Sequence, residues 1–113
     1  MQTLTAQQVC NVSSLVGIGC KSGDTVTGLS GVRRTRGLAV VFVAVSLSDN
    51  TRSELNRLQH RGTQVYSVDD MDEFTAVMGR LVRVVGIKKG SLADGIAGKL
   101  SGAEAEQTAA RRE

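Results

Sequence analysis

The run LAVVFVAV at residues 38–45 constrains the fold of this chain more than any other stretch. It is continuous, apolar and rich in β-branched residues, and no polar side chain interrupts it. A strand that is apolar on both faces is typical of the centre of a sheet with helices packed on both sides. The sequence therefore predicts an α/β domain built around this strand.

Helical and extended segments alternate on either side of this strand. The other extended segments are residues 25–27, 63–68 and 82–87. The helical segments begin at Thr5, Val32, Thr51, Asp70 and Ser91, mostly with the spacing of a capping box. The first helix is predicted to end near Gly17 or Gly19, and the third at Gly62. This alternation predicts a layered sandwich around a sheet of about four strands.

The length of 113 residues fits one domain. We predict that this domain occupies residues 1–100. The last stretch, SGAEAEQTAARRE at residues 101–113, has no apolar stripe. It is therefore predicted to be a frayed or disordered tail.

Basic residues exceed acidic ones in only one part of the chain. The formal net charge of +3 arises in residues 1–37, where Asp24 is the only acidic residue. The basic residues of that stretch are Lys21, Arg33, Arg34 and Arg36. This asymmetry suggests an anionic partner such as nucleic acid. A solvated basic face without a ligand explains the same charge pattern equally well.

Several functional classes are excluded by what the sequence lacks. The N-terminal residues do not resemble a signal peptide, and the longest apolar run is too short to cross a membrane as a helix. Two cysteines without CxxC spacing and a single histidine do not make a zinc site. The acids at residues 69–73 are explained by the start of a helix. We therefore expect a soluble, cytoplasmic protein with no metal, no cofactor and no membrane contact.

The stretch TVTGLSGVRRTRG at residues 25–37 holds the best candidate site. A strand that ends in glycine lets another backbone approach closely, and a helix N-terminus presents free N–H groups to phosphate. The sequence predicts that Thr27–Gly31, which includes Gly28, Leu29 and Ser30, forms a backbone cradle. Arg33, Arg34 and Arg36 follow as phosphate and groove contacts.

The same stretch also has the letters of a nucleophile elbow, Gly-x-Ser at Gly28–Ser30. That motif needs a second glycine two residues after the serine, and Val32 stands there. The only candidate base is His60, near the end of a predicted helix. We therefore predict no catalytic residues and no enzymatic activity.

Five stretches carry a resemblance to a known family by their order and spacing. They are LVGIGCKSGDTVTG, LAVVFVAVSLSDNTRSELNRL, TQVYSV, MDEFTAVMGR and VRVVGIKKGSLADGIAGKL. Together they resemble the kink-turn RNA-binding ribosomal-protein superfamily, the type found in the archaeal and eukaryotic large subunit, and most closely its bacterial YlxQ-like branch. The resemblance covers about residues 4–100. It implies a three-layer α–β–α sandwich that binds a sharply bent RNA internal loop without catalysis.

The resemblance also assigns residues. The family's RNA site is a Gly-x-Asn-Glu junction after the first strand, and a second contact comes from the loop before the last strand. Carried over, Gly28 matches the glycine, and Ser30 and Gly31 stand where the family has asparagine and glutamate. Val32 and Arg34 match an apolar and a basic helix position. The second loop corresponds to Arg80, Leu81, Val82 and Arg83.

The sequence thus predicts a protein that binds structured RNA, with ribosomal RNA as one candidate, in a ribosome or another ribonucleoprotein. Lys21, Arg80 and Arg83 would add flanking charge, and Leu81 would stack on or wedge into the RNA. Asparagine and glutamate read sheared G·A pairs in the family, so their absence shifts the binding towards the arginines. The alternative is a protein-interaction module of the same fold that no longer binds RNA.

Overall fold

The computed structural model describes residues 2–79 and 81–109 of the chain. The strands are β1 (Gln2–Leu4), β2 (Thr25–Thr27), β3 (Leu38–Ala44), β4 (Gln64–Val68) and β5 (Val84–Lys88). The helices are α1 (Ala6–Ser22), α2 (Leu29–Arg34), α3 (Asp49–Asn56), the 3₁₀ helix η1 (Arg57–Arg61), α4 (Asp72–Met78) and α5 (Ser91–Ala109). None of these helices is long and apolar enough to cross a membrane.

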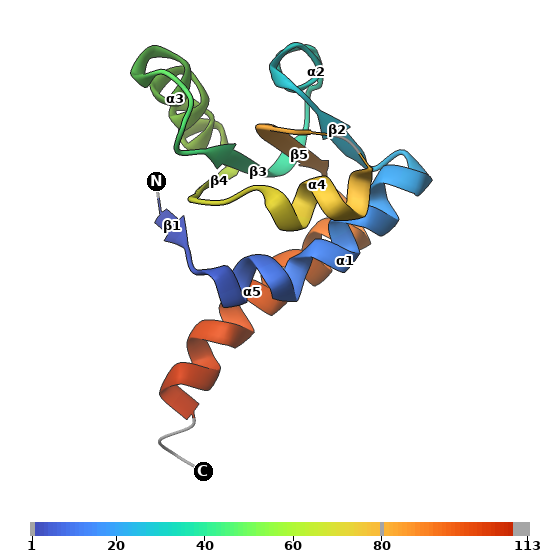
Figure 1. Ribbon diagram of the computed structural model, residues 1–113, viewed down its shortest axis with the longest axis vertical. Coiled ribbons are helices and arrows are strands. Elements are labelled where there is room, and N and C mark those ends of the chain that lie inside the picture. The colour runs from blue at the N-terminus through green and yellow to red at the C-terminus, as the bar shows by residue number, and fades with distance from the viewer. Residues whose placement is uncertain (1, 80, 110–113) are drawn as a thin grey trace.

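The strands form one sheet in the order β1-β4-β3-β5-β2. β1, β4 and β3 run parallel, whereas β5 is antiparallel to both of its neighbours, β3 and β2. Helices α1, α4 and α5 cover one face of the sheet, and α2 and α3 cover the other (Figure 1). The predicted three-layer α–β–α sandwich is therefore confirmed, with five strands instead of about four.

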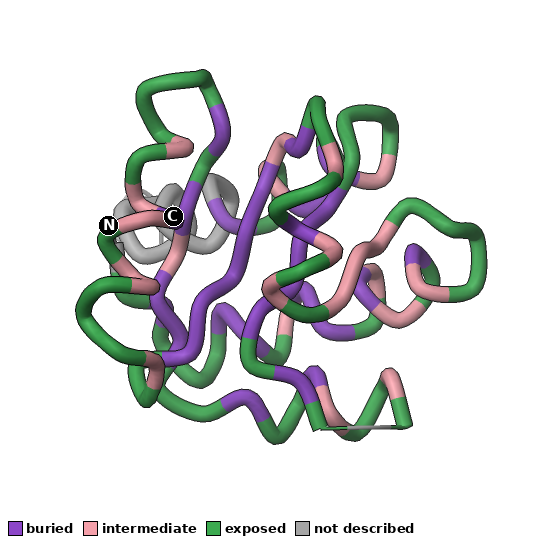
Figure 2. The backbone as a smooth tube through the Cα atoms, turned by 90° about the horizontal axis from the view of Figure 1, so that it is seen from above, coloured by how far each residue is buried: buried purple, intermediate pink, exposed green. Residues whose placement is uncertain are grey.

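The central strand β3 sends alternate side chains into two cores. Val40 and Phe42 join the larger core with residues of α1, α4 and α5. Val41 and Val43 join the smaller core, where Val32 of α2 and Leu55 of α3 meet them. Figure 2 shows these buried strands in the middle of the molecule, with exposed loops around them. Both faces of β3 are covered, as its continuous apolar sequence predicts.

Strand β1 was not predicted from the sequence. It has three residues, as β2 does, but its sequence QTL lacks the continuous β-branched run that marks β2 as TVT. Its place comes from tertiary pairing, because it lies parallel to β4 with Leu4 beside Val68. Leu4 is almost fully buried in the larger core, so this short edge strand also contributes to packing.

Helix α1 runs past the two glycines at which it was predicted to end. It stops at Gly23, which has a φ of 85° and closes the helix by donating to the Gly19 carbonyl. Gly17 and Gly19 instead lie where α1 is packed closely. A Cβ on Gly17 would lie 3.1 Å from Cβ of Val77, and one on Gly19 would overlap the side chains of Thr25 and Leu92. These glycines therefore serve packing and not termination.

We expect Gly19→Ala to destabilise the protein by about 1–3 kcal/mol, because overpacking forces its neighbours to move. Gly98→Ala is the matched control, since it makes the same change in α5, where a Cβ would meet nothing within 4 Å. That control should raise stability by roughly 0.5–1 kcal/mol through helix propensity. Urea unfolding of the three proteins measures both values. Equal stabilities would contradict the packing role of Gly19.

Other element boundaries differ from the predicted ones because local hydrogen bonds set where each helix begins. Helix α3 is capped by Ser48, whose Oγ accepts from the Thr51 N–H at 3.3 Å, so the predicted cap at Thr51 is wrong. The Asp70 carboxylate accepts from the Asp72 N–H, and Met71 stands at the cap of α4. Gly62 ends η1 with a φ of 87°, as predicted.

Helix α2 begins at Leu29 and not at Val32, and β5 begins at Val84 and not at Val82. Helix α5 continues to Ala109 and so includes residues 101–109, which the sequence analysis assigned to a tail. These residues are mostly Ala, Glu and Gln, which favour helix in the absence of tertiary contacts. Residues 110–113 of that tail lie outside the described residues.

Candidate nucleic-acid interface

Gly28 sets the path of the chain from β2 into α2. Its φ of 82° and ψ of 156° lie in a region that essentially only glycine occupies. Its N–H donates to the Val84 carbonyl at 2.9 Å, and its own carbonyl accepts from the Val32 N–H at 3.1 Å. One residue therefore closes the sheet edge and starts the helix, which requires the glycine found there.

Gly31 has a different reason to be glycine. A Cβ at this position would lie 2.7 Å from Cγ1 of Val26, because α2 packs closely on β2 here. A glutamate at this position, as in the family of the resemblance, does not fit unless the Val26 side chain or α2 shifts. Leu29 is half-buried against the smaller core, whereas Ser30 is exposed. Ser30 thus offers the accessible side chain within Thr27–Gly31.

The second predicted contact, the loop before β5, is held at its middle residue. Val82 is buried in the larger core, and the Arg83 carbonyl accepts from the Ala44 N–H at 2.9 Å. The side chains on either side of this anchor point outward: Leu81 is 74% exposed and Arg83 is exposed. Arg80 lies outside the described residues.

The sheet brings these two segments together. Thr27 pairs with Val85 across the β2–β5 ladder, and Gly28 bonds to Val84. The loop at residues 81–83 therefore lies beside the start of α2, although the two are about fifty positions apart in the sequence. We call residues 28–31 together with residues 81–83 the α2–β5 surface.

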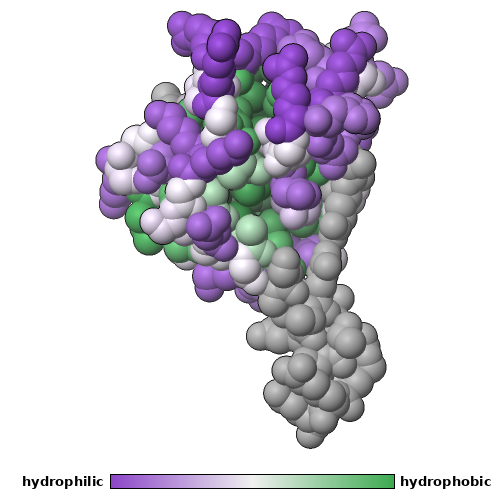
Figure 3. Space-filling model, turned by 180° about the vertical axis from the view of Figure 1, so that it is seen from behind, coloured by the Kyte–Doolittle hydropathy of each residue, from purple (hydrophilic) through white to green (hydrophobic). Residues whose placement is uncertain are grey.

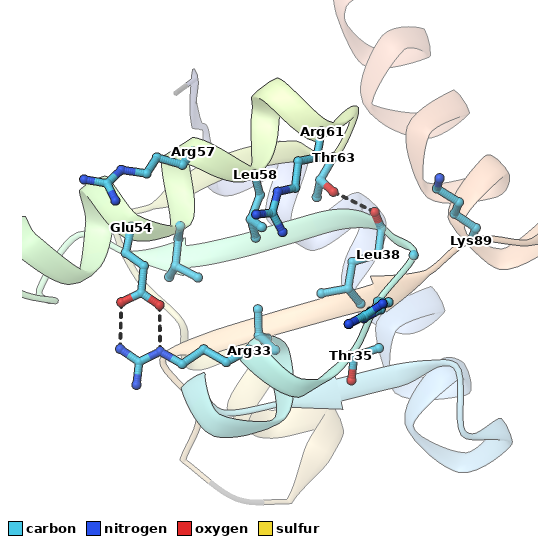
Figure 4. A pocket seen from close by; sticks show the side chains of 13 residues that line it. Arg33, Thr35, Leu38, Glu54, Arg57, Leu58, Arg61, Thr63 and Lys89 are labelled. Atoms are coloured by element: carbon cyan, nitrogen blue, oxygen red, sulfur yellow. Dashed lines mark hydrogen bonds and ion pairs between the residues drawn. The ribbon is translucent and has the colours of Figure 1, made fainter.

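Arg33 and Glu54 connect the two helices of this face. The guanidinium donates through Nε to Oε2 at 2.6 Å and through Nη2 to Oε1 at 2.7 Å (Figure 4). The hydrogen bond from Arg33 lowers the pKa of Glu54, and the same bond raises the pKa of Arg33. Both side chains are well exposed, at 53% and 40%, so an anionic ligand has access to the guanidinium.

The remaining predicted cations are spread over three places. Arg34 is exposed in the last turn of α2, next to the α2–β5 surface. Lys21 lies near the end of α1, beside Asp24 and the start of β2, so the length of β2 separates it from Gly28. Arg36 lies in the connection from α2 to β3, where it lines a groove.

This groove lies between α2 and the α3–η1 segment and has a volume of about 640 Å³. We call it the α2–η1 groove. Its cationic lining residues are Arg33, Arg36, Arg57, Arg61 and Lys89. Its apolar floor includes Val32, Leu38, Leu55 and Leu58. Hydrophilic side chains stand over this end of the molecule with hydrophobic atoms visible between them (Figure 3).

Arg57, Arg61 and Lys89 were not predicted as site residues; they come from η1 and from the residue after β5. A signal for the first two was present, because four positions separate them in a segment that was predicted as helix. In an α-helix that spacing places two cations on one side, although the segment forms a 3₁₀ helix. Nothing in the sequence indicates that α2 faces them, since this depends on both helices packing on the same side of the sheet.

Comparison with known proteins shows that other solved structures share this fold. No protein-family model matches this chain, and no curated protein matches it. Solved structures do, although both of those compared share only 18% sequence identity with it. Likeness at that level concerns the course of the backbone.

One of these structures is a Giardia lamblia 15.5 kDa RNA-binding protein, with a TM-score of 0.68 over 91% of this chain and 92% of that one. The other is a protein of unknown function from Bacillus halodurans, with a TM-score of 0.65 over 80% of this chain and 96% of that one. The α–β–α fold is therefore shared with these proteins across nearly their whole length.

Proposed function

We propose that this protein binds structured RNA through the α2–β5 surface and the arginines beside it, without catalysis. The observation that carries this proposal is the meeting of two distant segments at one edge of the sheet, fixed by the bond from Gly28 to Val84. The surface exposes one large apolar side chain, Leu81, and the cation Arg83, and Arg34 is exposed beside it. This combination suits RNA, because phosphates are bound by charge and unstacked bases by apolar contact.

Two further facts support the proposal. A structural neighbour over 91% of this chain is named as an RNA-binding protein. The sequence resemblance to the kink-turn superfamily points to the same two segments. We therefore propose a bent internal loop of the kink-turn type as the preferred RNA, a ribosomal or other ribonucleoprotein setting, and a place close to the YlxQ-like branch.

The absence of catalysis is also part of the proposal. The hydroxyl of Ser30, the residue of the nucleophile-elbow letters, has no hydrogen-bond partner among the described residues. His60 lies in η1, a different element. A serine without a general base is a poor nucleophile at neutral pH, so we assign Ser30 to hydrogen bonding with RNA.

The test is a titration against a kink-turn RNA and a straight duplex of equal length at two salt concentrations. We expect a preference for the kink-turn that persists at the higher salt, because contacts to bases and to a bent shape release few counterions. Equal and equally salt-sensitive binding to both RNAs would reduce the site to a general phosphate contact. Absence of binding to either RNA would contradict the proposal and favour the protein-interaction alternative.

A variant pair locates the binding. Leu81→Ser removes the exposed apolar side chain of the α2–β5 surface. We expect it to weaken binding to the kink-turn and to leave the affinity for the straight duplex unchanged. Ile18→Ser is the matched control, since Ile18 is also an exposed apolar residue, at 57%, but belongs to α1. Equal effects of the two substitutions on kink-turn binding would place the RNA elsewhere.

A further inference from the structure

The α2–η1 groove carries more positive charge than the fold itself needs. Of its cations, only Arg33 forms an ion pair within the described residues, and its partner Glu54 also attracts Arg57 without contact. The side chains of Arg36, Arg57, Arg61 and Lys89 have no hydrogen bond or ion pair with any described residue. Like charges that line one groove repel each other, and a bound anion removes this repulsion.

The groove leads away from the α2–β5 surface. Arg83 precedes β5 and Lys89 follows it, so six residue steps along the strand place them about 20 Å apart. The connection between β5 and the groove is direct, because the Lys89 N–H donates to the carbonyl of Gly37, another lining residue, at 3.0 Å. A chain that leaves the α2–β5 surface along α2 therefore reaches Arg36 and Lys89 next.

The shape of the groove selects among anions. Cations come from two sides of the groove, with Arg33 on α2 and Arg57 and Arg61 on η1 (Figure 4). Arg36, in the connection after α2, also lines it. A volume of about 640 Å³ is too small for a duplex but holds one or two nucleotides. The floor of Leu38, Leu55 and Leu58 offers apolar contact to a sugar or base, while the two sides contact phosphate.

We infer that the α2–η1 groove binds a single-stranded segment of RNA that continues from the structured RNA held at the α2–β5 surface. This inference rests on the proposed function. Glu54, the only acidic residue among the described lining residues, regulates the groove. Its carboxylate occupies both Nε and Nη2 of Arg33, so a phosphate competes with it for that guanidinium.

The experiment compares four RNAs: a blunt kink-turn, two versions of it that carry a six-nucleotide uridine extension at one or the other strand end, and the uridine hexamer alone. We expect one of the two extensions to tighten binding and to steepen the salt dependence by about 0.7 units of log–log slope per phosphate contacted. Arg61→Ala should remove part of that gain without affecting the blunt RNA. Lys99→Ala is the matched one-charge control, because Lys99 is exposed on α5 on the other face of the sheet. It should leave the gain from the extension intact.

The outcomes distinguish failure of the groove inference from failure of the proposed function. If the blunt kink-turn binds and neither extension changes affinity or slope, the groove inference is wrong and the proposed function stands. If the hexamer alone binds and Arg61→Ala weakens it while the blunt kink-turn fails to bind, the groove is confirmed and the proposed function is wrong. If Arg61→Ala and Lys99→Ala have equal effects, the extension contacts another part of the surface and the inference is overturned. Binding to none of the four RNAs overturns both.

Discussion

A protein with alanine at both Arg33 and Arg34 is expected to bind kink-turn RNA more weakly, with a salt dependence flatter by between about one and two units of log–log slope. Each phosphate contact that is lost removes about one unit. Arg34 is exposed in α2 and has no ion-pair partner among the described residues, so its replacement should account for a full unit. Arg33 should contribute less, because Glu54 already holds its guanidinium.

The measurement is the RNA affinity of each protein at four or more salt concentrations. Arg34→Ala is compared with Lys99→Ala, which removes the same charge from the opposite face of the sheet. A slope unchanged by Arg34→Ala, or changed as much by Lys99→Ala, would show that the RNA does not contact α2.

The smaller contribution of Arg33 to the salt dependence is tested by replacing its partner, Glu54. Glu54→Gln removes the carboxylate charge and releases Arg33, so we expect tighter binding with a slope steeper by about one unit. Adding Arg33→Ala to that variant should cancel the gain. If Glu54→Gln leaves the slope unchanged in the presence of Arg33, the ion pair does not compete with RNA.

The sequence was sufficient for the fold class because the decisive signal is local. Residues 38–45 are apolar on both faces, and such a strand requires helices on both sides of its sheet. The short strand β1 was missed because its sequence QTL has no β-branched run like the TVT of the equally short β2. Gly17 and Gly19 were misread as helix ends, since a sequence does not say whether a glycine relieves strain or makes room for a neighbour.

The candidate site divides in the same way. The cradle at residues 27–31 and the loop at residues 81–83 were found separately, from glycine pattern and family resemblance. Only the β2–β5 pairing brings them together. Arg33 and Arg36 were predicted as anion contacts, but the α2–η1 groove that they share with Arg57, Arg61 and Lys89 was not, because these cations come from three segments that approach each other through packing on the smaller core. The Arg33–Glu54 pair joins residues 21 positions apart and left no mark in the sequence either.

Gly28→Ala is expected to lower the free energy of unfolding by about 1–3 kcal/mol and also to weaken RNA binding. The stability loss follows from backbone strain, because a φ of 82° with a ψ of 156° excludes a Cβ even where space is open. For a domain of this length, each kcal/mol corresponds to a fall of about 4–8 °C in Tm. The binding loss follows from geometry, since relieving the strain disturbs the bond to Val84 that joins α2 to the loop at residues 81–83.

Gly23→Ala separates these two effects. Gly23 also has a positive φ, of 85°, but it ends α1 at the far end of β2 from the α2–β5 surface. Its replacement should cost about 1–2 kcal/mol of stability and leave RNA affinity unchanged below the unfolding transition. Thermal unfolding and RNA titration of both variants at one temperature measure the two quantities. If both variants lose stability and both keep full affinity, the RNA does not depend on the path of the chain at Gly28. A loss of affinity in Gly28→Ala alone would assign that path to RNA recognition, because the two substitutions impose similar strain at different ends of one strand.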